Sequence, residues 1–303
     1  MEHKNQGFDN VLNLVGSTPL IKLNTITSQF NGDFYAKVEA FNPGHASKDR
    51  MALHIIEQAE KQGLLKPGDT IIETISDQSG FSIAMVGCIK GYNCILAVSS
   101  KCEVSKIDTL KAMGVTVYVC PEPKSVDYSK SCFEVAKRLH REIKGSIYIN
   151  QYFNQLNSDA HYRSTGPEIW EQTTGKITHL VTCSGTGTTI SGTAKFLKEQ
   201  NPDIKILGVE AFCSVLKTFQ DTKACDAVET DLHGVGGLSE SFIPAVTDFD
   251  VVNYFSENDV IVVMFPDYSL RYLNKSYSDT WRNDQRFFDS VNKETIQKIQ
   301  YIK

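Results

Sequence analysis

The sequence predicts an α/β protein with mainly parallel sheets, folded as two lobes. Short apolar runs rich in β-branched residues recur along the chain, as in strands that are buried on both faces of a sheet. Segments with helical periodicity separate these runs, and such alternation is typical of strand–helix–strand units with right-handed crossovers. The chain has 303 residues, which is enough for two domains of ordinary size.

The expected strands and helices alternate from residue 34 onward. Strands are expected at residues 34–39, 70–73, 94–98, 115–120, 146–150, 179–183, 205–210 and 260–265. Helices are expected at residues 51–60, 82–90, 104–113, 130–143, 159–173 and 190–200. Turn residues at 66–69 and 201–203 separate helices from the strands that follow them. No flexible linker or internal repeat interrupts this order.

Composition and charge exclude several classes of protein. The chain has 31 basic and 36 acidic residues and a net charge of -5, so a nucleic-acid partner is not expected. No apolar run approaches the length of a membrane span, and the polar first ten residues lack the core of a signal peptide. A cytoplasmic protein without a membrane partner is therefore expected.

Cysteine and histidine spacing does not indicate a metal site. The eight cysteines are scattered through apolar stretches, at positions 88, 94, 102, 120, 132, 183, 213 and 225. They form no Cys-x-x-Cys pair, and His161 and His179 each stand alone in their segments. We expect reduced thiols in or near the core, and no bound metal.

Lys48 is placed where a lysine could serve as a nucleophile. It lies between the Pro43-Gly44 bend and an apolar-periodic segment, and Ser47 is a suitable N-cap, which puts Lys48 in the first helical turn. The positive end of the helix dipole, together with desolvation, favours the neutral amine that reacts with carbonyl compounds. The alternative interpretation of the same residues is a solvated helix start.

Two loops that follow expected strands have the chemistry of anion sites. The first loop, residues 74–80, offers hydroxyls and an amide suited to a carboxylate; it could also be a polar capping loop, and Asp77 would oppose an anion. The second loop, residues 184–189, combines two glycines with three threonines and suits a phosphate monoester better than a plain turn. It lacks the third glycine of a dinucleotide fingerprint and the Gly-Lys-Ser/Thr of a P-loop.

A reactive lysine, a carboxylate loop and a phosphate loop together suggest pyridoxal phosphate as cofactor. Five collinear groups of residues also resemble motifs of the fold type II pyridoxal-phosphate enzymes, in the cysteine synthase and cystathionine β-synthase family. They are Gly16-Ser17-Thr18-Pro19-Leu20, residues 42–50, residues 72–80, Asn150-Gln151-Tyr152 with residues 161–170, and Phe265-Pro266-Asp267 with residues 271–281. The resemblance covers nearly the whole chain.

The resemblance implies a two-lobed, tryptophan synthase β-like fold with three-layer αβα lobes. Residues 45–150 would form a smaller lobe that closes on the substrate, and residues 1–44 with 151–303 a larger lobe that carries the phosphate loop. It also implies a small amino-acid substrate, a thiol co-substrate, and a homodimer or a pairing with a paralogue.

The resemblance further assigns a role to each site residue. Lys48 would bind the cofactor through a Schiff base and abstract the α-proton of serine or an activated serine, and a thiol or sulfide would then replace the β-substituent. The residues expected to contact cofactor phosphate are Ser184, Gly185, Thr186, Gly187, Thr188 and Thr189, with Gln78 at the ring hydroxyl. The residues expected at the substrate are Ser76, Asp77, Ser79, Gln151 and Tyr152.

Several departures from the family pattern fall at these sites. His45 and Ala46 replace a glycine and a serine, residues 75 and 77–79 are altered, and Thr188 replaces a glycine. Residues 257–259 lead almost directly into the last expected strand, where family members carry a segment whose serine contacts the pyridine nitrogen. Three hypotheses stay open: a working β-replacing enzyme, a pseudoenzyme that serves as a binding, assembly or regulatory subunit, and an enzyme of altered specificity in which His45 and Asp77 accommodate an unusual substrate.

Overall fold

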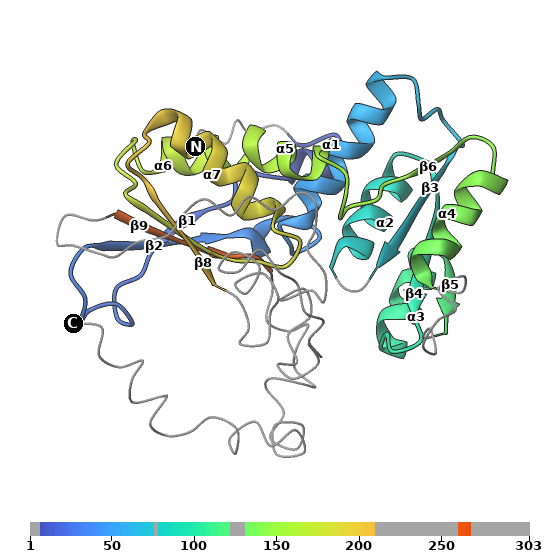
Figure 1. The fold of residues 1–303 in the computed structure, drawn as a ribbon, viewed down its shortest axis with the longest axis horizontal. Helices are drawn as coiled ribbons and strands as arrows, with labels where there is room; N and C mark the ends of the chain where they lie inside the picture. Colours follow the sequence, from blue (N-terminus) through green and yellow to red (C-terminus); the bar gives the residue numbers. More distant parts are fainter. Residues whose placement is uncertain (1–6, 76–77, 122–130, 210–259, 268–303) are drawn as a thin grey trace, which may run out of the picture.

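The fold contains two mainly parallel β-sheets that lie side by side, each with its own helices (Figure 1). A computed structural model describes residues 7–75, 78–121, 131–209 and 260–267. Helix α1 (Lys48–Lys61) lies between the two sheets and packs against α2 (Ser79–Ile89) on one side and α5 (Leu156–Arg163) on the other. Lys48 is therefore placed at the junction of the two lobes.

The first sheet has five strands in the order β1-β2-β9-β7-β8. These are β1 (Leu20–Lys22), β2 (Asp33–Val38), β9 (Val260–Phe265), β7 (His179–Cys183) and β8 (Lys205–Val209). Among the described strands of this sheet, only β1 and β2 pair antiparallel. Helices α6 (Thr165–Gln172) and α7 (Thr188–Gln200) cover one face of this sheet, where Ile169 and Leu197 pack against Leu180 and Val262.

The second sheet has four parallel strands in the order β5-β4-β3-β6. These are β5 (Thr116–Cys120), β4 (Asn93–Ser99), β3 (Thr70–Ile75) and β6 (Ser146–Tyr148). Successive strand residues point to opposite faces. Ile71 packs in the core shared with α1, α2 and α3 (Val104–Ala112), whereas Ile72 packs with α4 (Cys132–Glu142). Helices therefore cover both faces, which gives this lobe three layers.

The strands and helices expected from the sequence are present, with one correction among the helices. Residues 179–183 and 260–265 are strands with the predicted ends. The expected single helix at 159–173 is instead two helices, α5 and α6, which are separated at Ser164. Pro167 explains the break, because its ring would clash with the carbonyl of Arg163 in a continuous helix but is tolerated in the first turn of a new one. The short strand β1 was not predicted.

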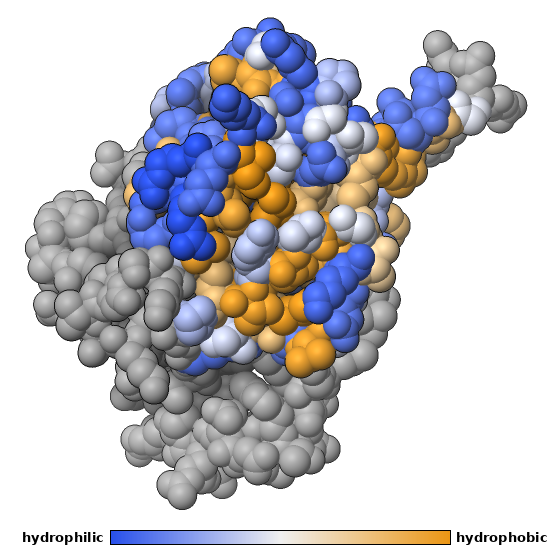
Figure 2. Space-filling view, turned by 90° about the vertical axis from the view of Figure 1, so that its right-hand side faces the viewer, coloured by the Kyte–Doolittle hydropathy of each residue, from blue (hydrophilic) through white to orange (hydrophobic). Residues whose placement is uncertain are grey.

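Surface apolar residues gather on the outer face of the four-stranded lobe (Figure 2). Val104, Tyr118 and Val119 are among the exposed apolar side chains of this lobe. No helix in the described ranges is both long enough and apolar enough to cross a membrane. We call these exposed apolar residues of the four-stranded lobe the apolar band.

Candidate active site

The loop before α1 is fixed to the end of β9. The Ser47 N–H donates to the Pro266 carbonyl at 2.8 Å, and Ala46 forms an isolated antiparallel bridge with Asp267. Ser47 holds the N-cap position as predicted, although its side chain makes no capping hydrogen bond. Lys48 is the first residue of α1, so its position is set by contacts at the carboxyl end of a central strand.

Asp49 holds the bend on the other side of Lys48. Its buried carboxylate accepts hydrogen bonds from the Gly44 N–H at 2.5 Å and from the Ser82 hydroxyl at 2.6 Å. Gly44 has no room for a side chain here, since a Cβ would lie 2.3 Å from an Asp49 oxygen. The same carboxylate therefore connects the loop before Lys48 to α2, a helix of the four-stranded lobe.

The structure brings Lys48 to the expected phosphate loop. Lys48 Nζ donates to Thr186 Oγ1 at 3.1 Å, and Thr186 Oγ1 lies 2.9 Å from Thr188 Oγ1. Gly187 adopts the left-handed conformation with φ of 76° and is the N-cap of α7, so the loop delivers the backbone N–H groups of the first helical turn to one place. Thr188, which departs from the family pattern, is fully buried.

The expected carboxylate loop is joined to Gln151. Gln151 Nε2 donates to Ser79 Oγ at 2.9 Å and to the Thr74 carbonyl at 3.4 Å, and both side chains are buried. Gln78, also buried, is the N-cap of α2. Ser76 and Asp77 lie outside the described residues, as do residues 257–259 and 271–281.

Tyr152 and Ile75 complete this side of the site. Tyr152 is buried and packs edge-on against Phe133, with ring centroids 5.9 Å apart. Ile75, where family members have threonine, is part of the apolar core and faces Gly80, whose Cβ would lie 2.4 Å from Ile75 Cδ1. The change at Ile75 is therefore accommodated by core packing.

Glu73 belongs to the motif at residues 72–80, but the sequence assigned no role to it. It is fully buried in β3, where Oε1 accepts from the Thr74 N–H at 2.6 Å and Oε2 accepts from the Gln151 N–H at 3.0 Å. Burial raises the pKa of this carboxyl to about 7, although the backbone N–H donors and the charge of Lys48 oppose the shift. Glu73 thus links both segments of the expected carboxylate site.

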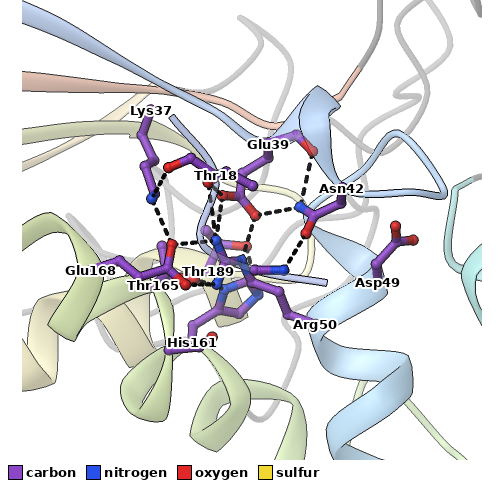
Figure 3. Close-up of polar contacts among 12 residues, drawn as sticks. Thr18, Lys37, Glu39, Asn42, Asp49, Arg50, His161, Thr165, Glu168 and Thr189 are labelled. Atoms are coloured by element: carbon purple, nitrogen blue, oxygen red, sulfur yellow. Dashed lines mark hydrogen bonds and ion pairs between the residues drawn. The ribbon is translucent and has the colours of Figure 1, made fainter. Parts of the chain in front are cut away.

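Arg50, two residues after Lys48 in the first turn of α1, belongs to a buried cluster of charged residues (Figure 3). We call Lys37, Glu39, Arg50 and Glu168 the ion cluster. Arg50 Nε donates to Glu39 Oε2 at 2.6 Å, and its terminal nitrogens contact both oxygens of Glu168 at 2.5 and 2.8 Å. Lys37 Nζ donates to Glu168 Oε2 at 2.6 Å. Two positive and two negative charges thus compensate one another and join β2, α1 and α6.

Contacts within the cluster favour the charged forms of its members, and burial opposes them. Burial alone would raise the pKa of Glu168, but the hydrogen bonds and charge of Arg50, with Lys37, lower it to about 2. For Lys37 burial is the larger effect, and it lowers the pKa despite the contact with Glu168. Thr18 adds an uncharged contact, since its hydroxyl donates to Glu39 Oε1 at 2.6 Å. The first turn of α1 is therefore anchored through Arg50.

His161 is a second site residue that the sequence did not assign. It lies on α5, is fully buried, and contacts Thr165 Oγ1 through Nδ1 at 2.9 Å and Thr189 Oγ1 through Nε2 at 3.2 Å. Burial, reinforced by the charges of Lys48 and Arg50, lowers the pKa of His161 to about 3. The imidazole is therefore neutral and abuts the last residue of the phosphate loop.

The described residues fit a phosphate-bearing cofactor that is linked to a lysine. Ser184 Oγ is buried and has no hydrogen-bond partner among the described residues, and such a hydroxyl calls for a polar ligand. It lies at the start of the loop whose Thr186 contacts Lys48 Nζ. The described ranges contain no group of three or more histidine, cysteine or acidic side chains arranged to hold a metal.

Comparison with known proteins agrees with this chemistry. The family profile described as pyridoxal-phosphate dependent enzyme matches residues 11–266. Cystathionine beta-synthase of Apis mellifera is 42% identical over 245 residues, which are 80% of this chain and 48% of that protein. Cysteine synthase B of Pseudomonas aeruginosa is 37% identical over 203 residues, which are 67% of each chain. The chain spans about half the length of the animal cystathionine beta-synthases that it matches.

The fold matches solved structures as well. The crystal structure of an O-ureido-L-serine synthase is similar with a TM-score of 0.80 and 25% sequence identity, over 95% of this chain and 97% of the other. This match confirms the predicted fold class. The chain belongs to the family of pyridoxal-phosphate dependent enzymes, whose cofactor is the one that the sequence predicts.

Proposed function

We propose that the chain catalyses β-replacement on serine or an activated serine, with a thiol or sulfide as the entering group. The observation that carries the proposal is the contact between Lys48 Nζ and Thr186 Oγ1 at 3.1 Å, because it joins the candidate nucleophile to the candidate phosphate loop. The matched relatives named cystathionine beta-synthase and cysteine synthase support the same class of chemistry.

In the proposed mechanism each residue has a separate task. Pyridoxal phosphate, when bound, would supply an aldehyde that reacts with amines and a ring that withdraws electrons from the α-carbon of an amino acid. Lys48 Nζ would supply an amine to hold the cofactor and would accept the α-proton of the substrate. The backbone N–H groups and hydroxyls of residues 184–189 hold the phosphate at the start of α7.

The substrate carboxylate is assigned to the other loop. Ser79 and Gln151 are already in contact at 2.9 Å, so they form a pair that an entering carboxylate can share. Ser76 and Asp77 belong to the same proposed subsite on sequence grounds. Gln78 is proposed at the ring hydroxyl of the cofactor, and Tyr152 at the wall of the substrate pocket.

The test compares purified wild-type protein with Lys48→Ala. Wild-type protein is expected to show a visible absorption band with pyridoxal phosphate and to consume serine or O-acetylserine in a thiol-dependent reaction. Lys48→Ala is expected to lose both the band and the turnover, while Lys61→Ala, at the far end of α1, keeps them. A wild-type protein that binds the cofactor but gives no product with any serine derivative or thiol would contradict the proposal.

The same experiment decides the alternative, a pseudoenzyme that serves as a binding, assembly or regulatory subunit. The altered residues of the two loops motivate this alternative. His45 and Ile75 argue against simple decay, because His45 keeps the left-handed backbone with φ of 60° and Ile75 is absorbed by the core. Turnover by the isolated chain excludes a pure pseudoenzyme.

We also propose that residues 45–150 close on the substrate as a lobe and that two chains associate. The contacts of α1 with both α2 and α5 make it a suitable pivot, and the apolar band on the four-stranded lobe is suitable surface for association (Figure 2). Light scattering of the purified protein measures association, and a monomeric mass at micromolar concentration would refute the dimer. Small-angle scattering with and without serine measures closure.

A further inference from the structure

We propose that His161 is a positioning residue whose Nε2–H fixes the hydroxyl of Thr189, so that the Thr189 O–H points toward the cofactor phosphate. The inference rests on the proposed role of residues 184–189 in phosphate binding. It does not depend on which reaction the site performs. His161 itself touches neither substrate nor cofactor in this proposal.

The contacts of His161 connect two helices with the phosphate loop (Figure 3). The imidazole extends from α5 and is fully buried. Nδ1 lies 2.9 Å from Oγ1 of Thr165, the first residue of α6, and Nε2 lies 3.2 Å from Oγ1 of Thr189, in the first turn of α7. One ring thus spans the space between α6 and the loop.

The hydrogen-bond donors of His161, Thr165 and Thr189 are compatible with one arrangement of hydrogens. A neutral imidazole has one donor and one acceptor, and each hydroxyl has a single hydrogen to donate. Within the described part of the chain, His161 Nδ1 is the hydrogen-bond partner of the Thr165 side chain, which is fully buried. A buried donor is costly to leave unpaired, so the Thr165 O–H donates to Nδ1 and the ring proton lies on Nε2.

This tautomer determines whether the Thr189 hydroxyl can donate a hydrogen bond to an anion. With the proton on Nε2, the ring donates to Thr189 Oγ1, and the hydroxyl hydrogen of Thr189 stays available for an anion at the start of α7. With the opposite tautomer, Nε2 would accept that hydrogen, and Thr189 would present only lone pairs to a phosphate. Phosphate binding therefore requires the first arrangement at this residue.

Burial and two nearby positive charges keep the ring neutral. Burial has the largest effect and lowers the pKa of His161, the charges of Lys48 and Arg50 lower it further, Glu39 and Glu168 raise it, and the resulting value is about 3. A charged imidazolium would donate from both nitrogens and would force the Thr165 hydroxyl to find another acceptor. Burial, with Lys48 and Arg50, thus preserves the single-donor state on which the arrangement depends.

The first test reads the tautomer directly. Nitrogen-15 NMR of histidine-labelled protein, with His161 assigned by its absence in His161→Gln, is expected to show a neutral ring protonated at Nε2 between pH 6 and pH 8 (roughly, the range in which an ordinary histidine titrates). A ring protonated at Nδ1, or a charged ring in this range, would overturn the proposal. This measurement needs neither turnover nor cofactor.

The second test uses Thr165→Val, which removes the donor to Nδ1 without touching the loop. The dissociation constant of pyridoxal phosphate is expected to rise by roughly tenfold or more, the effect of one charge-assisted hydrogen bond. Affinity for pyridoxal, which lacks the phosphate, is expected to stay unchanged. Thr173→Val is the matched control, since Thr173 is a buried threonine of the same region whose hydroxyl donates to the Ile169 carbonyl.

A double-mutant cycle then tests whether His161 acts through Thr189. Thr189→Val and His161→Gln are each expected to weaken pyridoxal phosphate binding, and the double variant to be no weaker than Thr189→Val alone. Additive losses, or equal losses for pyridoxal, would overturn the proposal and indicate a general structural role. A wild-type protein that shows the expected tautomer and affinities but no turnover would refute the proposed reaction and leave this inference standing.

Discussion

The two loops that meet at Lys48 are held in different ways. The phosphate loop is fixed by a neutral and a cationic group, because His161 and Lys48 both contact its threonine hydroxyls. The carboxylate loop is fixed by a buried carboxyl group, because Glu73 accepts backbone hydrogen bonds from Thr74 and Gln151.

This difference matters for the proposed site, which would bind the phosphate of the cofactor and the carboxylate of a substrate. A carboxyl close to the substrate carboxylate would repel it when ionised, and its raised pKa reduces that repulsion at neutral pH. On the phosphate side, hydroxyls, N–H donors and Lys48 surround the loop, and the carboxylates of the nearby ion cluster are paired with Arg50 and Lys37. We therefore expect the two sides to respond differently to mutation and to pH.

The largest expected effect is on the phosphate side, from Arg50→Met. The change leaves Glu39 and Glu168 buried with a single lysine, and breaking a buried pair in this way costs about 3–5 kcal/mol. Urea denaturation measures the loss. Lys22→Met is the control, because the Lys22–Asp33 pair is about half exposed and is expected to contribute little to stability. Similar losses for both variants would show that the ion cluster does not anchor α1.

The second-largest expected effect is on the carboxylate side, where Glu73 makes the free energy of unfolding depend on pH. Glu73 is protonated in the folded protein up to about pH 7 but only up to about pH 4.5 when unfolded, so folding retains a proton between these values. Its contribution to stability is present below pH 4.5 and is lost as the pH rises to 7, by about 3 kcal/mol at most.

Unfolding of wild type and Glu73→Gln between pH 4.5 and pH 7 measures this contribution, since glutamine does not titrate. The stability difference between the two proteins is expected to shift in favour of the variant as the pH rises. Glu142→Gln, at an exposed position of α4, is the control and is expected to leave the slope unchanged. If the free energies of unfolding of wild type and Glu73→Gln change with pH in the same way, Glu73 is ionised in the folded protein.

The sequence predicted the strands well and the long-range contacts of the site poorly. Residues 260–265 were found because an apolar β-branched run is a local signal. Glu73 was missed because its partner Gln151 is 78 residues away, and the Lys37–Glu168 pair spans 131 residues. The sequence neighbours of a charged residue do not indicate whether tertiary packing will bury it.

The two loops could be singled out in the sequence because their chemistry is local, and their roles in binding stay predictions. A strand, two glycines and three threonines define the phosphate loop without reference to the rest of the chain. The helix break at Ser164 was missed for the opposite reason, since the apolar period continues across it and only the clash of Pro167 reveals it. Motifs with a local physical cause are thus read from sequence, and the residues that support them are not.

A smaller effect on the carboxylate side is expected from Gln151→Leu. The variant removes the amide that contacts Ser79 and the Thr74 carbonyl but keeps the backbone N–H that binds Glu73. Losing one hydrogen bond to a charged substrate is expected to raise KM for serine by roughly tenfold or more, with little change in affinity for pyridoxal phosphate. Steady-state kinetics measures KM for serine, and cofactor titration measures the affinity for pyridoxal phosphate. A larger loss of cofactor affinity would mean that the two loops do not work independently.

The smallest effect tests the substitution nearest to Lys48, at the junction of both loops. His45 has φ of 60°, a conformation that costs a residue with a side chain about 1 kcal/mol and costs glycine little. The His45 ring is exposed and contacts the Ala40 carbonyl at 3.1 Å, which offsets part of this strain. His45→Gly is therefore expected to raise stability in urea by at most about 1 kcal/mol. Thr174→Gly is the matched control, since Thr174 has φ of 52° away from the site. If His45→Gly destabilises the protein while Thr174→Gly does not, the histidine contact outweighs the backbone strain, and His45 is then a supporting residue of the Lys48 loop.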